Sequence, residues 1–384
     1  MYLSTNQLKK RRFPAAALAL STLSTGAIAD PSSRWQTNLS PGVTELGQEV
    51  FDLHMLVVWI CVAISVAVFG VLLYVLINHT KASGRTPATF HESTVVELMW
   101  TIVPALILIA IAVPATNTLI KLYDSSDSDV DILVTGYQWK WKYEYLSKDG
   151  GETFSFLSIL STPADQFEIG ATAEKGENYL LEVDEPLVIP VNKKVRFLVT
   201  SADVLHAWWV PALSVKRDAV PGYINDAWTI PQKEGIYRGQ CAELCGKDHG
   251  FMPIVVKVVS EKEYEEWVAS KLSSSKADLT EKSLDELVAS GEALYNKNCS
   301  GCHAVNGTGI PGVFPALKGS SIALGDVNAH IDVVVNGAPG TAMSAYGAQI
   351  KPDELAAIIT YERNAWGNNT GDAVQASDIV NFNQ

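Results

Sequence analysis

Residues 241–252, CAELCGKDHGFM, carry two thiols, one imidazole and one thioether. These soft ligands favour copper, zinc or iron–sulfur centres over magnesium and calcium. A structural zinc site would require a second zinc knuckle close by, and none follows directly after this segment. A blue-copper site uses one cysteine with two histidines and a methionine, which leaves one thiol here unexplained. The extra thiol therefore indicates two copper ions that share two bridging sulfurs.

A second imidazole for such a centre must come from outside this segment. The candidate is His206 in DVLHAWWVP, 35 residues before Cys241. Two or three strands of a small barrel would bridge that separation. The alternative is a disulfide between Cys241 and Cys245, which an oxidising compartment permits. A disulfide would leave His206, His249 and Met252 without a role.

A second metal-binding motif lies downstream, Cys299-Ser-Gly-Cys302-His303. This spacing is typical of covalent haem c attachment, in which two thioethers hold the porphyrin and the histidine binds iron. Apolar residues at helical spacing in 284–297 and 352–366 indicate helices on both sides of the motif. A thioredoxin-like redox site would need a βαβ pattern, which the sequence around the motif does not predict.

The sixth iron ligand is predicted from the distribution of methionines. Only Met252 and Met343, of five, lie beyond residue 100, and both fall where a thioether ligand is needed. Met343 is therefore the candidate, because histidine–methionine ligation raises the haem potential and suits an electron carrier. His330 is the alternative, and it would give a bis-histidine haem. The fifth cysteine, Cys61, lies in an apolar run and is expected to be a buried small hydrophobe.

Three apolar segments indicate export and membrane insertion. Residues 1–29 combine a basic start, a short apolar stretch and an A-x-A exit, as in a signal peptide, with a retained anchor as the alternative. Residues 55–77 and 98–120 are uncharged and long enough to span a bilayer. The loop between them carries Lys81 and Arg85, so the positive-inside rule places it in the cytoplasm. Residues 30–54 and everything after 120 then lie outside the cytoplasm.

The polar remainder is long enough for two domains, 121–260 and 284–384. Short apolar and aromatic runs between glycines and prolines predict a β-sandwich or Greek-key barrel in the first domain. The expected strands are Val130–Val134, Tyr179–Val183, Leu187–Pro190, Lys194–Val199 and Ile254–Val259. A short helix at 261–272 and a linker up to 283 would join the domains. Aromatic residues at every second position of 137–145 predict one strand with an aromatic face.

The pairing of His206 with the cysteine loop resembles the binuclear copper (CuA) domain of cytochrome c oxidase subunit II. The resemblance covers nearly all of residues 30–260, and residues 284–370 resemble a fused class I cytochrome c. It implies a multidomain fold with a two-helix transmembrane hairpin, an all-β cupredoxin-like Greek-key barrel and an all-α cytochrome c domain.

The resemblance also implies roles for individual residues. The copper ligands would be His206, Cys241, Glu243 through its carbonyl, Cys245, His249 and Met252. The Glu243 side chain would bind a magnesium ion shared with the catalytic subunit. Trp139 would accept electrons from the donor, although packing in the barrel core explains the same residue. Glu97 would line the start of a proton path, although a carboxylate at a helix N-terminus is also favoured by the helix dipole.

By this resemblance the chain is the electron-transfer subunit of a terminal oxidase in the bacterial inner membrane. It would pass electrons from a cytochrome c-type donor through haem c and copper to subunit I, which reduces oxygen to water, with subunit III as a further partner. The alternative is a membrane-anchored cytochrome that acts as a separate electron carrier or a copper chaperone. The net charge of −13 argues against nucleic acid as a partner. The acidic residues of 276–384 would form a face that steers a basic donor. The alternative is that they form an ordinary solvated surface with no role in steering.

Overall fold

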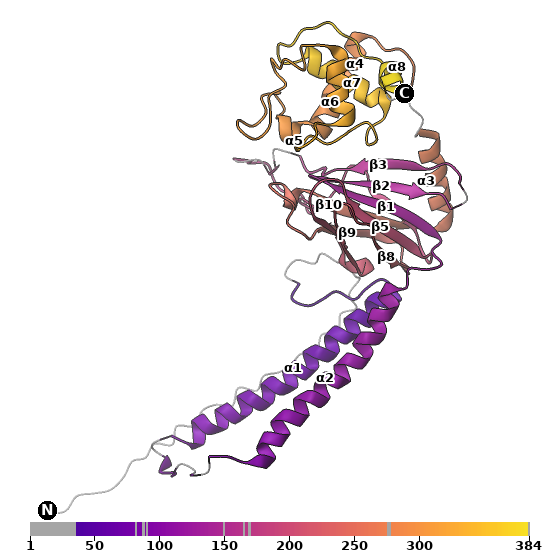
Figure 1. The fold of residues 1–384 in the computed structure, drawn as a ribbon. Coiled ribbons are helices and arrows are strands. Elements are labelled where there is room, and N and C mark those ends of the chain that lie inside the picture. Colours follow the sequence, from indigo (N-terminus) through magenta and orange to yellow (C-terminus); the bar gives the residue numbers. More distant parts are fainter. Residues whose placement is uncertain are drawn as a thin grey trace, which may run out of the picture. The chain divides into compact units, whose positions relative to one another are not determined.

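The computed structural model describes residues 36–80, 83–86, 89, 91–148, 150–163, 166–167, 170–274 and 278–382. The predicted signal peptide and Lys81 lie outside these residues. The helices are α1 Glu45–Asn78, α2 Thr94–Tyr123, α3 Glu261–Ser274, α4 Leu284–Asn298, α5 Ser300–His303, α6 Val327–Asn336, α7 Pro352–Asn364 and α8 Ala376–Phe382 (Figure 1). The strands are β1 Val130–Tyr137, β2 Lys140–Leu146, β3 Phe154–Ser158, β4 Leu187–Pro190, β5 Val195–Ser201, β6 His206–Val210, β7 Val215–Ala219, β8 Asn225–Thr229, β9 Gly235–Cys241 and β10 Pro253–Val259.

Helices α1 and α2 contain the two predicted spans and are long and apolar enough to cross a bilayer. None of the side chains in their most apolar windows is buried within the protein. Cys61 is exposed, so the expectation that it is buried is wrong. It lies on the outer surface of a helix, where apolar side chains would contact lipid. An ion pair between Lys121 and Glu49 links the two helices near one end.

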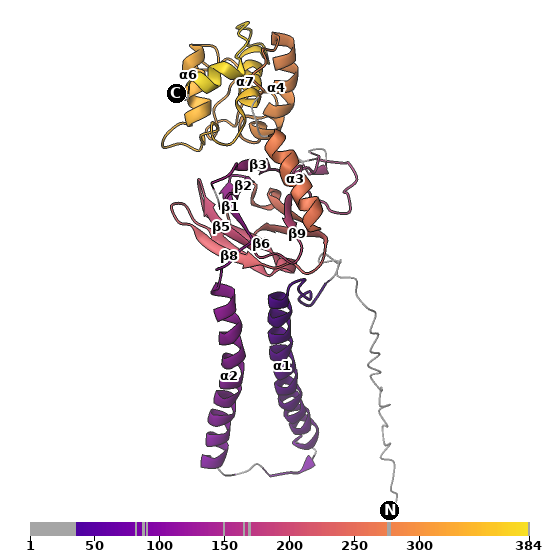
Figure 2. The same ribbon diagram turned by 90° about the vertical axis from the view of Figure 1, so that its right-hand side faces the viewer.

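Two five-stranded sheets form the β-domain, with strand orders β3-β2-β1-β5-β8 and β4-β10-β9-β6-β7. Pairs β1–β5 and β4–β10 are parallel, and the other pairs are antiparallel. Alternate residues of each sheet point into a shared core, as in β5, where every second side chain is buried. The prediction of a sandwich-like β-domain is confirmed, and Figure 2 shows the strands from a second direction.

A buried carboxylate ties the two parallel central strands β1 and β5 together. Asp131 accepts two hydrogen bonds from Arg196, at 3.0 and 3.1 Å, and one from Ser128 at 2.6 Å. Burial raises the pKa of Asp131, but the hydrogen bonds from Ser128 and Arg196 outweigh it, and the net pKa is lowered. The ionised carboxylate therefore stabilises the folded sheet.

Two of the strand predictions are wrong. Residues 179–183 form a turn with one isolated bridge, Leu160 to Val183, because Leu180 adopts a positive φ of 61° and its N–H donates to Thr162 instead of a strand. The aromatic run at 137–145 is broken, since β1 ends at 137 and β2 begins at 140.

The turn at 138–139 exists because its polar groups bind residues outside the sheet. The backbone N–H of Gln138 donates to Asp203, and the side chains of Gln138 and Trp139 donate to the carbonyl of Cys245. Beyond the turn the period-two prediction is confirmed. Three aromatic side chains of β2 point inward and are buried: Trp141, Tyr143 and Tyr145.

The C-terminal domain is helical, and its central contact is the crossing of α4 and α7, which lie side by side in Figure 2. Gly291 permits this close approach, because an added Cβ would lie 2.1 Å from the carbonyl oxygen of Ala357. Tyr295 packs against Tyr361 and Trp366 at the same crossing. The predicted helices at 261–272, 284–297 and 352–366 are confirmed as α3, α4 and α7, with α7 ending at Asn364.

Candidate copper and haem sites

Three neighbouring strands position the cysteine loop. Cys241 is the last residue of β9, and Pro253 begins β10 directly after the loop. Gln240 pairs with Pro253 across the β9–β10 ladder, so both ends of the loop are fixed. Strand β6 pairs with β9 on its other side and begins at His206. The sheet therefore brings His206 to the cysteine loop, as the sequence predicts.

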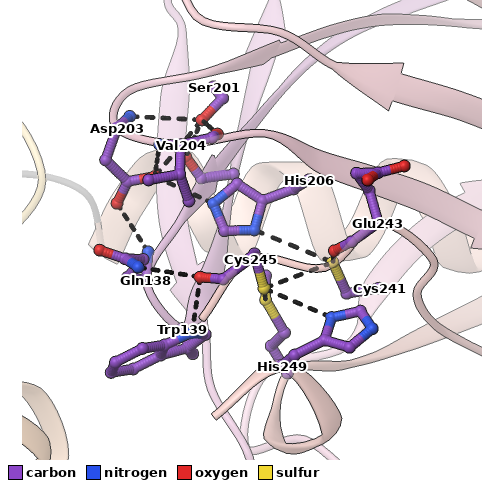
Figure 3. Close-up of polar contacts among 12 residues, drawn as sticks. Gln138, Trp139, Ser201, Asp203, Val204, His206, Cys241, Glu243, Cys245 and His249 are labelled. Carbon is purple, nitrogen blue, oxygen red and sulfur yellow. Dashed lines mark hydrogen bonds and ion pairs between the residues drawn. The ribbon is translucent and has the colours of Figure 1, made fainter. Parts of the chain in front are cut away.

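Sulfur and imidazole atoms converge inside this loop (Figure 3). The sulfurs of Cys241 and Cys245 lie 3.8 Å apart. Cys245 Sγ lies 3.4 Å from His249 Nδ1 and 3.5 Å from Met252 Sδ. A disulfide bond is about 2.05 Å long, so the disulfide alternative is not formed here. The separations leave room for metal ions between the sulfurs.

The ring of His206 is held in one orientation. Its Nε2 lies 2.9 Å from Asp203 Oδ1, and its Nδ1 lies 3.8 Å from Cys241 Sγ. With the Nε2–H donated to Asp203, the lone pair on Nδ1 faces the sulfurs, as metal-binding histidines require. Burial lowers the pKa of His206, but the hydrogen bonds and negative charges of Asp203 and Cys241 together outweigh it, and the net pKa is raised.

The two cysteines influence each other's protonation. The hydrogen bond shared with Cys245 lowers the pKa of Cys241 to about 3, and the same contact raises the pKa of Cys245. The shared hydrogen bond therefore favours the thiolate form of Cys241 and the protonated form of Cys245. A thiolate is the form of cysteine that binds copper, so the site is prepared for a soft cation.

The surrounding groups complete the polar environment of the loop. The carbonyl oxygen of Glu243 lies 3.4 Å from Cys241 Sγ, and the Glu243 side chain is exposed. The carbonyl of Cys245 accepts from Gln138 Nε2 at 2.8 Å and from Trp139 Nε1 at 3.2 Å. Trp139 is thus one hydrogen bond away from a residue of the sulfur cluster.

The second predicted site lies around a cavity of about 350 Å³ in the helical domain. Cys299, Cys302, His303 and Met343 all line it, with mostly apolar neighbours. This volume is in the range of cofactor sites in proteins. Burial raises the pKa of both cysteines, so they are present as thiols.

His303 is oriented by the backbone. Its Nδ1 lies 2.9 Å from the carbonyl oxygen of Pro315, which can only accept a hydrogen bond. The proton therefore sits on Nδ1, and Nε2 keeps its lone pair for iron. His330 also lines the cavity, but its Nε2 lies 2.9 Å from Glu362 Oε2.

Glu97 lies in the first turn of α2, where the backbone N–H of Ser93 donates to its carboxylate at 3.4 Å. This contact supports the role of a helix-terminal acid. The proton-path role remains a prediction.

Sequence reasoning missed the groups that orient the ligands: Asp203, Gln138 and Pro315. Asp203 is the only one with a usable signal, because a carboxylate three residues before a metal-binding histidine can turn back onto its ring. Nothing in the sequence marks the Pro315 carbonyl, since any residue could supply it.

Comparison with known proteins gives family matches in all three parts of the chain. Residues 130–259 match the family described as cytochrome c oxidase subunit II, periplasmic domain, and residues 32–117 match the transmembrane domain of the same subunit. Residues 286–361 match cytochrome c oxidase, cbb3-type, subunit III. The fold and sites thus define a membrane-anchored copper protein with a cytochrome domain.

Two relatives show the family. The probable cytochrome c oxidase subunit 2 of Rickettsia felis is 38% identical over 256 residues, covering 67% of this chain and 78% of the relative. Subunit 2 of Zea mays is 38% identical over 250 residues, covering 64% and 93%. The crystal structure of the periplasmic domain of subunit II from Bradyrhizobium japonicum is 42% identical, covers 40% of this chain and 99% of that one, and has a TM-score of 0.34.

The chain belongs to the cytochrome c oxidase subunit II family. It is an electron-transfer subunit of a haem–copper oxidase, an oxidoreductase complex, and it carries a cytochrome c domain. Its cofactors are copper and haem, its partners are other oxidase subunits, and its β-domain lies outside the cytoplasm.

Proposed function

We propose that Cys241 and Cys245 hold two copper ions between their sulfurs. His206 and His249 would be the imidazole ligands, and Met252 and the carbonyl of Glu243 would be weak ligands. The observation that carries this proposal is the convergence of two thiols, two imidazoles and a thioether in a largely buried site. The donor set suits copper, because hard cations prefer oxygen ligands.

We propose that Cys299 and Cys302 attach one haem c covalently, with His303 and Met343 as axial ligands. The cavity that these four residues line has the apolar walls that a porphyrin needs. The orientation of His303 by the Pro315 carbonyl supports the assignment. Met343 is favoured over His330, because histidine–methionine ligation raises the haem potential and suits an electron carrier.

When bound, the two centres would carry single electrons from a cytochrome c-type donor through haem and then copper to subunit I. The residues of this chain act by fixing geometry. Asp203 holds the ring of His206, and the sheet holds both ends of the cysteine loop. Burial of the thiols excludes water from the copper site. A rigid ligand set reduces the atomic movement that each electron transfer requires.

The wider setting is also proposed from the family resemblance. We place the chain in the bacterial inner membrane, with residues 1–29 as a cleaved signal peptide, the 78–97 loop in the cytoplasm, and the copper and haem domains in the periplasm. Subunits I and III would be its partners, and the exposed Glu243 carboxylate would bind a shared magnesium ion. Trp139 would receive electrons for copper, and Glu97 would stand at the start of a proton path in a proton-translocating complex.

The test is metal analysis and electron paramagnetic resonance of the full chain in detergent. Two coppers and one haem per chain, with an electron shared by two coppers, are expected. Cys245→Ser should give the four-line spectrum of an isolated cupric ion, and Cys61→Ser, a cysteine outside both sites, should leave the spectrum unchanged. An isolated cupric spectrum in the unaltered chain would refute the binuclear site. Copper loss to a partner on mixing would favour the chaperone alternative.

A further inference from the structure

Two ionisable side chains interrupt the apolar wall of the haem cavity. His330 on α6 is 2% exposed and Glu362 on α7 is 3% exposed, and both line the cavity. His330 shares its helix face with Val333 and Val334, which also line the cavity. Neither His330 nor Glu362 has a part in the haem attachment proposed above, so their burial calls for a separate explanation.

The two side chains form a pair with one open position. His330 Nε2 lies 2.9 Å from Glu362 Oε2. His330 Nδ1 is buried and has no hydrogen-bond partner among the described residues. If the Nε2–H is donated to an ionised Glu362, the pair carries one negative charge, and Nδ1 offers a lone pair that can take up a proton.

The charged neighbours do not neutralise this pair. Arg363 follows Glu362 but directs its guanidinium to Asp372 and to the carbonyls of Ala323 and Gly325. On α8, which packs against α6, Asp378 is exposed.

Other titratable groups lie near the pair or on the same helices. The buried cation Lys140 on β2 lies 4.5 Å from the ring centroid of Tyr346, and its charge interacts with Cys299 and Cys302. The charge of Glu362 interacts with three buried groups, Tyr295, Tyr346 and Cys299. Burial raises the pKa of each, so all three stay protonated. Asp332 on α6 bonds Asn336, and Asp353 and Glu354 lie in the first turn of α7, away from Glu362.

We propose that His330 and Glu362 form a proton-binding site coupled to the redox state of the haem. The proposal depends on the haem c site proposed above. One electron from the donor reaches the haem as one proton from solvent binds Nδ1 of His330, while the Nε2–H stays donated to Glu362. The proton leaves when the electron passes to copper. The total charge of the cavity is then the same in both states, which a poorly solvated interior favours.

The test is a spectroelectrochemical titration of haem c in the full chain from about pH 5 to pH 8, where histidine ordinarily titrates. Within this range the potential should fall as pH rises. If one proton binds for each electron, the ratio of oxidised to reduced haem at a fixed solution potential changes tenfold per pH unit. This corresponds to a shift of about 59 mV per pH unit in the haem potential. The double variant His330→Gln with Glu362→Gln should remove this slope.

Glu292→Gln is the matched control, because Glu292 is an exposed acid on α4, and it should keep the wild-type slope. A slope that persists in the double variant overturns the proposal. If the double variant does not fold, the wild type decides, since a potential that is constant over the whole range also overturns it. Absence of covalent haem in the wild type would instead refute the haem site itself, so the two failures are distinguishable.

Discussion

Replacing Asp203 by asparagine tests how the copper site is held. Asp203 Oδ1 lies 2.9 Å from His206 Nε2, and Oδ2 accepts from the backbone N–H of Gln138 at 2.7 Å. The variant keeps the size of the side chain but removes its charge. It also replaces one acceptor oxygen by an amide nitrogen, which can only donate. The single remaining oxygen cannot accept from both Gln138 and His206.

The expected loss follows from these two contacts. Hydrogen bonds to a charged group contribute about 1.5–3 kcal/mol, and neutral ones about 1 kcal/mol. Removing a carboxylate that orients a metal-binding histidine typically lowers metal affinity about 10- to 100-fold. At about 1.36 kcal/mol per tenfold change, this is a loss of about 1.4–2.7 kcal/mol in copper binding. The folded structure should survive, since Asp203 is partly exposed and lies in the loop between β5 and β6.

The assay is copper competition against a chelator with the full chain in detergent, together with the hyperfine spectrum of the bound copper. Asp203→Asn should weaken copper binding by the stated factor and alter the imidazole contribution to the spectrum. Asp218→Asn, an exposed acid on β7, is the matched control and should bind as the wild type does. Unchanged affinity and spectrum in Asp203→Asn would show that His206 is not a copper ligand or needs no orientation.

Three further changes give distinct outcomes. Met343→Ala should abolish the methionine-to-iron charge-transfer band and lower the haem potential, because thioether ligation raises it; a retained band would refute the ligand assignment. Asp131→Asn should lower the free energy of unfolding by about 1.5–3 kcal/mol in urea titrations at neutral pH. Since the pKa of Asp131 is lowered on folding, its contribution is present above the ordinary value of 3.8 and disappears as pH falls through the folded pKa, so the variant and wild type should converge in acid. Gly291→Ala should destabilise the cytochrome domain by about 1–3 kcal/mol in thermal melts, because its Cβ overlaps the Ala357 carbonyl; an unchanged melting temperature would mean that α4 and α7 can separate freely.

The sequence makes a definite prediction of the metal-binding residues, because their chemistry depends on residue type and spacing. Cys241, Cys245, His249 and Met252 lie in one short segment, so little folding information is needed to bring them together. His206 was a candidate because its separation of 35 residues from Cys241 could be bridged by two or three strands, but its place beside β9 could not be derived from spacing alone. The transmembrane helices and the helices around the haem motif could also be predicted from the sequence, because helical periodicity is a local property.

The two wrong strand predictions share a physical cause. Whether 179–183 and 138–139 extend a strand depends on hydrogen-bond partners far along the chain, such as Thr162 for Leu180 and Asp203 for Gln138. Period-two patterning cannot show these partners. The exposure of Cys61 was misjudged because an apolar helix looks the same in a protein core and in lipid. The His330–Glu362 pair has no sequence signal, since its members come together only through the packing of α6 on α7.

The chain leaves β10 through α3, and only residues 275–283 separate α3 from α4. A tether of this length confines two sites to each other's vicinity at an effective concentration on the order of millimolar, whatever the dilution of the sample. Transfer from the cytochrome domain to copper should then follow first-order kinetics, independent of protein concentration. Salt should slow delivery by an outside donor far more than this internal relay, because the relay requires no diffusional encounter.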